Sequence, residues 1–125
     1  MIIDFHTHAF PEKIVEKAMR TLIHNAGNAI PFTDGTAAGL LKYMDANGID
    51  KAVVLNIATN PKQQHNVNDF AASINSDRLI SFGSVHPDAP DAIEELHRIK
   101  EMGLKGIKLH PDYQGAALSP KAPFP

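Results

Sequence analysis

The sequence contains no cysteine and only 6% aromatic residues, with no tryptophan. Disulfide bonds and thiolate metal ligands are therefore excluded, and a reducing cytoplasm fits this composition. No apolar stretch approaches the roughly 18 residues of a membrane-spanning helix, and the N-terminus lacks the cationic leader of a signal peptide. Lys and Arg together number 12 against 14 Asp and Glu, without a basic run. We expect a cytoplasmic protein with neither a nucleic-acid nor a membrane partner.

Histidine, by contrast, is abundant, with seven residues in a chain of 125, a length suited to one modest domain. Two of them end the opening stretch Met1-Ile-Ile-Asp-Phe-His-Thr-His8. Three apolar side chains in this stretch favour a buried strand: Ile2, Ile3 and Phe5. Because side chains alternate along a strand, Asp4, His6 and His8 are expected to share one face. Two imidazoles so placed predict a divalent-metal site; the alternative is a histidine-rich N-terminus without a ligand.

Helical and strand-like segments alternate in the remainder of the chain. Further strands are expected near residues 52–57, 79–85 and 105–110, and helices near 11–25, 36–47, 63–75 and 89–102. The later strands recur about every 27 residues with a helix between them, which is the signature of β/α units in a parallel sheet. The sequence therefore predicts an α/β fold.

The carboxyl ends of these strands collect polar side chains. Right-handed crossovers place the carboxyl ends of parallel strands at one edge, where α/β folds build their sites. The side chains expected at that edge are His6, His8, Asn56, His86, Lys108 and His110. Beyond residue 115 the pattern ends, and three of the last six residues are proline. We therefore expect one domain over residues 1–115 and an irregular proline-rich tail over 116–125.

Three motifs occur in a distinctive order along residues 1 to 115. They are Ile3-Asp-Phe-His-Thr-His8 followed by Phe10-Pro11, then Phe82-Gly-Ser-Val-His-Pro87, then Gly103-Leu-Lys-Gly-Ile-Lys-Leu-His-Pro-Asp-Tyr-Gln114. In this order and spacing they resemble the amidohydrolase superfamily. Within it they are most similar to the second amidohydrolase family, which includes proteins like aminocarboxymuconate-semialdehyde decarboxylase.

The resemblance implies a TIM-type (β/α)₈ barrel, of which this chain is the first half. It also implies one or two divalent metal ions at the carboxyl mouth, with zinc the first expectation and manganese or another ion an alternative. His6 and His8 are then metal ligands, and His110 is a third candidate. Lys108 and His86 are expected to contact a small-molecule substrate. For Lys108 and His110, substrate-side polarity without metal contact is an equal alternative.

The chain departs from the family in its length. Such a barrel needs about 250 residues and eight strands, whereas four strands are expected here and the family's strand-eight aspartate is absent. No catalytic set is therefore complete, and we expect either a truncated product or a homo-oligomer joined through open sheet edges. Three functions remain open. They are hydrolysis of a small molecule by a metal-activated water, nonoxidative decarboxylation on the same metal, and an inactive half barrel that serves as an assembly module.

Overall fold

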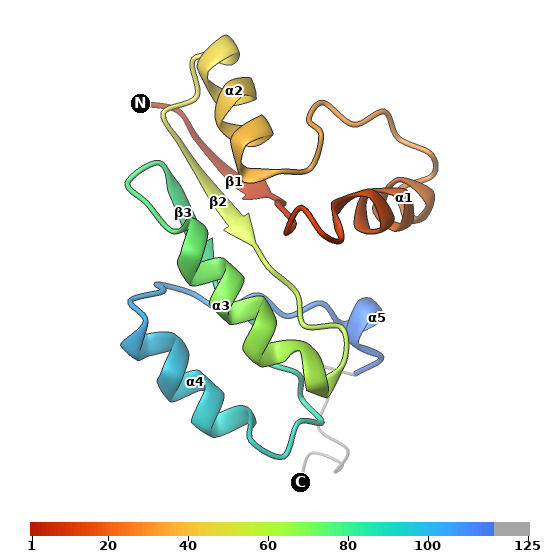
Figure 1. Cartoon of the computed structure of the whole chain (residues 1–125), viewed down its shortest axis with the longest axis vertical. Helices are drawn as coiled ribbons and strands as arrows, with labels where there is room; N and C mark the ends of the chain where they lie inside the picture. The colour runs from red at the N-terminus through yellow and green to blue at the C-terminus, as the bar shows by residue number, and fades with distance from the viewer. Residues whose placement is uncertain (117–125) are drawn as a thin grey trace, which may run out of the picture.

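The computed structural model describes residues 1–116, and its three strands form one parallel sheet. The strands are β1 (Ile3–Thr7), β2 (Lys51–Leu55) and β3 (Leu79–Phe82), in the order β1-β2-β3 (Figure 1). The central strand β2 carries the continuous apolar run 52–55, and all four of its residues are buried. A run of this kind suits a parallel strand that is covered on both faces. The parallel α/β architecture expected from the sequence is thus confirmed.

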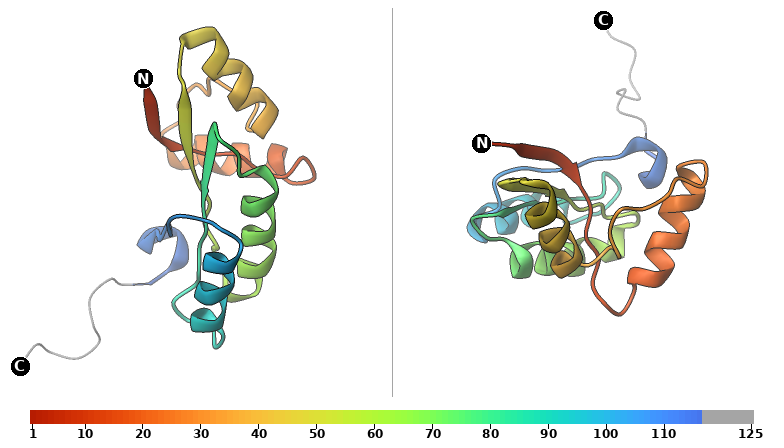
Figure 2. Two further views of the ribbon diagram at one scale, coloured as in Figure 1. Left: turned by 90° about the vertical axis from the view of Figure 1, so that its left-hand side faces the viewer. Right: turned by 90° about the horizontal axis from the view of Figure 1, so that it is seen from above.

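Helices occupy the connections between the strands. They are α1 (Val15–Asn25), α2 (Ala37–Asn47), the 3₁₀ turn η1 (Pro61–Gln63), α3 (Gln64–Ile74), α4 (Ala92–Glu101) and the short α5 (Pro111–Gln114). Figure 2 shows α3 and α4 on one side of the strands and α5 on the other. Among residues 1–116, no helix combines the length and the apolar character that a membrane crossing requires.

Two apolar clusters hold the helices against the sheet. One joins β2 and β3 to α2, through the buried Ala52, Val54, Leu79, Leu40 and Met44. The other joins α3 and α4 to the chain after β3, through Ala71, Val85, Ile99 and Leu104. Both clusters pack helices against the sheet or the chain that follows it. Neither contains any of the histidines expected at the carboxyl ends of the strands.

The fourth expected strand, at residues 105–110, is not present in the structure. This segment makes only an isolated parallel bridge between Gly83 and Ile107. Two backbone hydrogen bonds support it, one from Gly83 N to Gly106 O at 2.9 Å and one from Lys108 N to Gly83 O at 2.8 Å. The outer edge of β3 has no strand partner among the described residues, yet only Gly83, just past the end of β3, forms a bridge with the segment. It still runs alongside the sheet, so its polar residues reach the expected edge.

The first strand also differs from expectation, because its apolar side chains are exposed. Ile2, Ile3 and Phe5 are 57%, 47% and 65% exposed, respectively. Among the described residues, β1 pairs only with β2, and its other edge has no strand partner. The Phe5 ring contacts Phe82 across β2 in an edge-to-face arrangement, with ring centres 6.0 Å apart. The proline-rich tail expected at 116–125 lies, apart from its first residue, outside the described residues.

Candidate metal and substrate site

A bulge in β1 determines how its histidines are presented. Asp4 is aligned with Ala52 and Thr7 with Val54, so three steps along β1 match two along β2. Ala52 and Val54 share a face, which places Asp4 and Thr7 on that helix-covered face and His8 on the opposite one. The expectation that Asp4 and His8 share a face is therefore wrong. The Asp4 carboxylate instead accepts a hydrogen bond from His6 N at 3.1 Å, which stabilises the local turn.

The rings of His6 and His8 nevertheless lie close together, as the sequence predicted. Their centres are 5.2 Å apart and their planes meet at 69°. Nδ1 of His8 lies 3.0 Å from the carbonyl oxygen of Leu55, at the carboxyl end of β2. A ring whose Nδ1 donates to a backbone carbonyl has its tautomer fixed and its Nε2 free to bind a ligand.

The surroundings of His8 favour its neutral form. Burial lowers the pKa of His8, the hydrogen bond with Leu55 opposes this in part, and positive charge on His6, Lys108 and His110 lowers the pKa further. A neutral imidazole is the form that ligates a metal. The charges of Lys108 and His110 thus act on His8, while the ring of His6 lies directly beside it.

His110 lies just before α5 and packs on the ring of Tyr113. The two rings are stacked, with centres 4.2 Å apart and planes inclined by 18°. Nδ1 of His110 is buried, and no hydrogen-bond partner for it exists among residues 1–116. Within the same residues, no three side chains of His, Asp or Glu come close enough to hold one metal ion. The structure therefore pairs His6 with His8 but does not add His110 to them as a third ligand.

His86 is committed to contacts inside the protein. The residue is only 4% exposed, with Nε2 3.0 Å from the carbonyl oxygen of Gln114 and Nδ1 accepting from Asp88 N at 3.2 Å. Both ring nitrogens are therefore occupied. A contact between His86 and a substrate, as the sequence predicted, would require one of these hydrogen bonds to break.

Sequence reasoning missed the residue that joins this edge together. Gln114 is buried, and its Nε2 donates to the carbonyl oxygens of Ala58 at 3.0 Å and Val85 at 2.8 Å. Its Oε1 accepts from His110 N at 3.0 Å, which fixes the backbone that carries His110. Position 114 lies beyond the expected strands, and only its place four residues after His110 could have hinted at this role.

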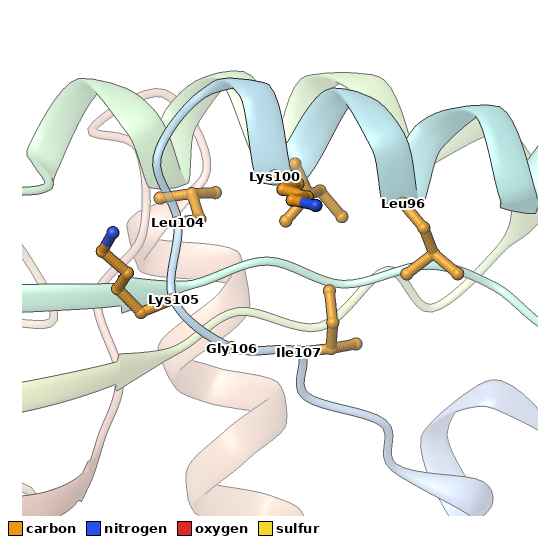
Figure 3. Close-up of a pocket in the computed structure, with 7 residues that line it drawn as sticks. Leu96, Lys100, Leu104, Lys105, Gly106 and Ile107 are labelled. Carbon is orange, nitrogen blue, oxygen red and sulfur yellow. The ribbon is translucent and has the colours of Figure 1, made fainter.

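Two hollows lie near the sheet, and they differ in what lines them. The smaller, of about 160 Å³, lies between α4 and residues 104–107 (Figure 3). It is lined by apolar residues and two lysines, and it contains none of the predicted site residues. The larger, of about 930 Å³, lies between α1 and α3 and includes His8 in its lining. Of the two, only the larger hollow adjoins the histidine pair.

Comparison with known proteins bears on the whole chain. A model of the family described as Amidohydrolase matches residues 3–125. The matched range includes all five predicted site residues, namely His6, His8, His86, Lys108 and His110. No curated protein matches the sequence.

Proposed function

Since the chain belongs to the amidohydrolase family, we propose that it provides one half of a metal-dependent hydrolase of small molecules, with His6 and His8 as two metal ligands. The observation that carries this proposal is the geometry of the histidine pair. Two imidazole nitrogens about 2.0–2.1 Å from one tetrahedral zinc ion hold their ring centres roughly 5 Å apart. The ring centres of His6 and His8 are 5.2 Å apart, and this separation supports a shared ion.

The chain's own residues prepare this position for a metal ion. The carbonyl of Leu55 orients the His8 ring, and burial keeps the ring neutral. A divalent ion bound there would lower the pKa of a bound water to about 7 and so provide a nucleophile at neutral pH. The Lys108 ammonium, whose charge reaches His8, is suited to attract a negatively charged group of the substrate.

The pair alone does not complete a catalytic centre. A catalytic zinc site has three protein ligands and an open position, whereas the described residues bring only two histidines together. We propose that the missing ligands come from a second copy of the chain, since residues 117–125 contain no His, Asp, Glu or Cys. The exposed edge of β1, next to the pair, is the surface across which such a copy would add.

The proposal is tested by separating the species and assaying each. The purified chain is loaded with Zn²⁺ or Mn²⁺, resolved by size into monomer and assembly, and assayed on amides, lactones and aromatic acids. We expect metal-dependent turnover in the assembly and almost none in the monomer, because loss of a general base alone costs about 10²–10⁴-fold.

A matched pair of variants completes this test. His6→Ala should abolish the turnover of the assembly, while His97→Ala, an exposed position on α4, should preserve it. Robust metal-dependent turnover by a proven monomer, or an assembly indifferent to His6→Ala, would contradict the proposal.

A further inference from the structure

The larger hollow is a cleft with two helical walls and a strand end as its floor. Its volume is about 930 Å³, and its lining comes from the segment between His8 and Ile14, from α1 and α3, and from the carboxyl end of β2 with the residues after it. Figure 1 shows α1 and α3 on either side of the end of β2. Cavities of about 300–1,000 Å³ are typical of sites for small molecules.

Each helical wall of this cleft carries a row of apolar side chains. Helix α1 presents Ile14, just before its first residue, and then Ala18 and Leu22 at helical spacing. Helix α3 presents Val67 and Phe70 opposite them. None of the residues of α1 is buried, and Ile14 is 51% exposed. An amphipathic helix normally covers such a row against a neighbour, whereas here Ala18 and Leu22 are only half-buried and line the cleft.

The charge in the cleft is of one sign. Lys13, just before α1, and Lys17, within α1, line it four residues apart, and no aspartate or glutamate of the described residues does so. Neither lysine takes part in an ion pair within residues 1–116. The apolar row thus runs beside two unpaired cations, which complements a ligand with an apolar body and a negative group.

The shape of the cleft restricts the ligand further. The lining on α1 extends from Ile14 to Asn25, which spans about 16 Å at 1.5 Å per residue. We propose that this cleft binds an elongated amphipathic anion, a hydrocarbon chain with a carboxylate head. The hydrocarbon lies between the rows of α1 and α3, and the carboxylate meets Lys13 and Lys17. Binding needs no metal ion, so it can be measured independently of the function proposed above.

The first experiment titrates the full chain with dodecanoate by calorimetry, below the micelle concentration and in the presence of EDTA. We expect saturable binding at one site, and much weaker binding of dodecanol, which lacks the charge. The double variant Lys13→Ala/Lys17→Ala should bind dodecanoate about tenfold more weakly, since each exposed charge pair contributes up to about fivefold. Lys42→Ala, an exposed lysine of α2 outside the cleft, should bind as the wild type does.

A second pair of measurements locates the hydrocarbon. Ala18→Trp should fill the cleft from its α1 wall and abolish binding. If that variant does not fold, a spin-labelled fatty acid added to the wild type should broaden the amide signals of residues 14–25 and 63–70 selectively. Non-saturable uptake, equal affinity in the double-lysine variant, or broadening elsewhere on the surface would overturn the proposal.

Discussion

The side chain of Gln114 joins three segments at the carboxyl edge of the sheet. It donates to carbonyl oxygens that follow β2 and β3, at Ala58 and Val85, and accepts from the backbone of His110. All three partners are backbone groups, and Gln114 itself is 5% exposed, so water cannot easily replace it. A buried polar group left without a partner costs about 1–3 kcal/mol.

Replacing Gln114 by alanine should therefore lower the free energy of unfolding by about 2–4 kcal/mol, since several buried groups lose their partner at once. Urea denaturation followed by circular dichroism measures this. The matched control is Gln63→Ala on the exposed turn η1, which should stay within about 1 kcal/mol of the wild type because water can replace its hydrogen bonds. Equal losses in the two variants would show that Gln114 does not hold this edge together.

Glu95 is the second buried polar residue with a structural role. Its side chain is fully buried on α4 and accepts hydrogen bonds from Arg98 and Asn68 at 2.8–3.0 Å, and Nδ1 of His65 lies 2.8 Å from it. Burial alone would raise the pKa of Glu95, but the hydrogen bonds from Arg98 and Asn68 outweigh it, so the pKa is lowered. The ionised carboxylate is therefore the form that the folded protein stabilises.

This shift predicts a pH dependence of stability. Because its pKa is lower when folded than when unfolded, Glu95 contributes fully above about pH 4.3, and its contribution is lost as the pH falls through the lowered value. Glu95→Gln should cost about 1.5–3 kcal/mol at pH 7 and progressively less toward acid. Urea denaturation across this pH range measures the difference, with the exposed Glu94→Gln as control. If the loss of unfolding free energy in Glu95→Gln did not shrink as the pH falls, the ionised Glu95 carboxylate would not be the stabilising form.

The sequence predicted the histidine pair but not these two residues. His6 and His8 stand out because two histidines one residue apart at the end of a strand are a pattern typical of metal ligands. Gln114 and Glu95 act through partners 27 to 56 residues away along the chain, or three to four residues away, and residue type alone does not identify such partners.

At the scale of elements, strand β2 was predictable and the segment 105–110 was not. The apolar run of β2 has one stable environment, the centre of a sheet, and the structure places it there. The 105–110 segment alternates like a strand, but a strand also needs a continuous ladder of hydrogen bonds with a neighbour. Its pairing with the chain after β3 is limited to the single bridge at Gly83. The bulge in β1 was equally invisible, because it depends on register against β2.

The exposed flank of β1 predicts association between copies of the chain. Unpaired strand edges with apolar side chains tend to add another strand, and Phe5 is the most exposed apolar side chain within β1. Analytical ultracentrifugation should show concentration-dependent assembly of the wild type, and Phe5→Lys should shift it to monomer. Phe32→Lys, at a still more exposed position in the loop before α2, should not. A wild type that stays monomeric at high concentration would remove β1 as an interface.

At the scale of the whole molecule, the parallel α/β architecture followed from the β/α repeat alone. Whether the metal site is complete could not be predicted from the sequence, because a metal centre depends on how several strand ends converge in space. His6 and His8 converge, His86 is bound internally, and His110 remains apart from the pair. The part of the proposed metal centre that the structure supports is therefore the pair of His6 and His8, with the His8 ring oriented by the carbonyl of Leu55.

Zinc binding by the histidine pair is the most direct test of this account. Wild type, His6→Ala and His97→Ala are equilibrated with Zn²⁺ over a range of concentrations, and bound metal is measured by mass spectrometry. We predict saturable binding by the wild type and by His97→Ala, and affinity at least about tenfold weaker in His6→Ala, because a site with so few ligands cannot lose one cheaply. Equal zinc content in the wild type and His6→Ala would contradict the assignment of the pair as a metal site.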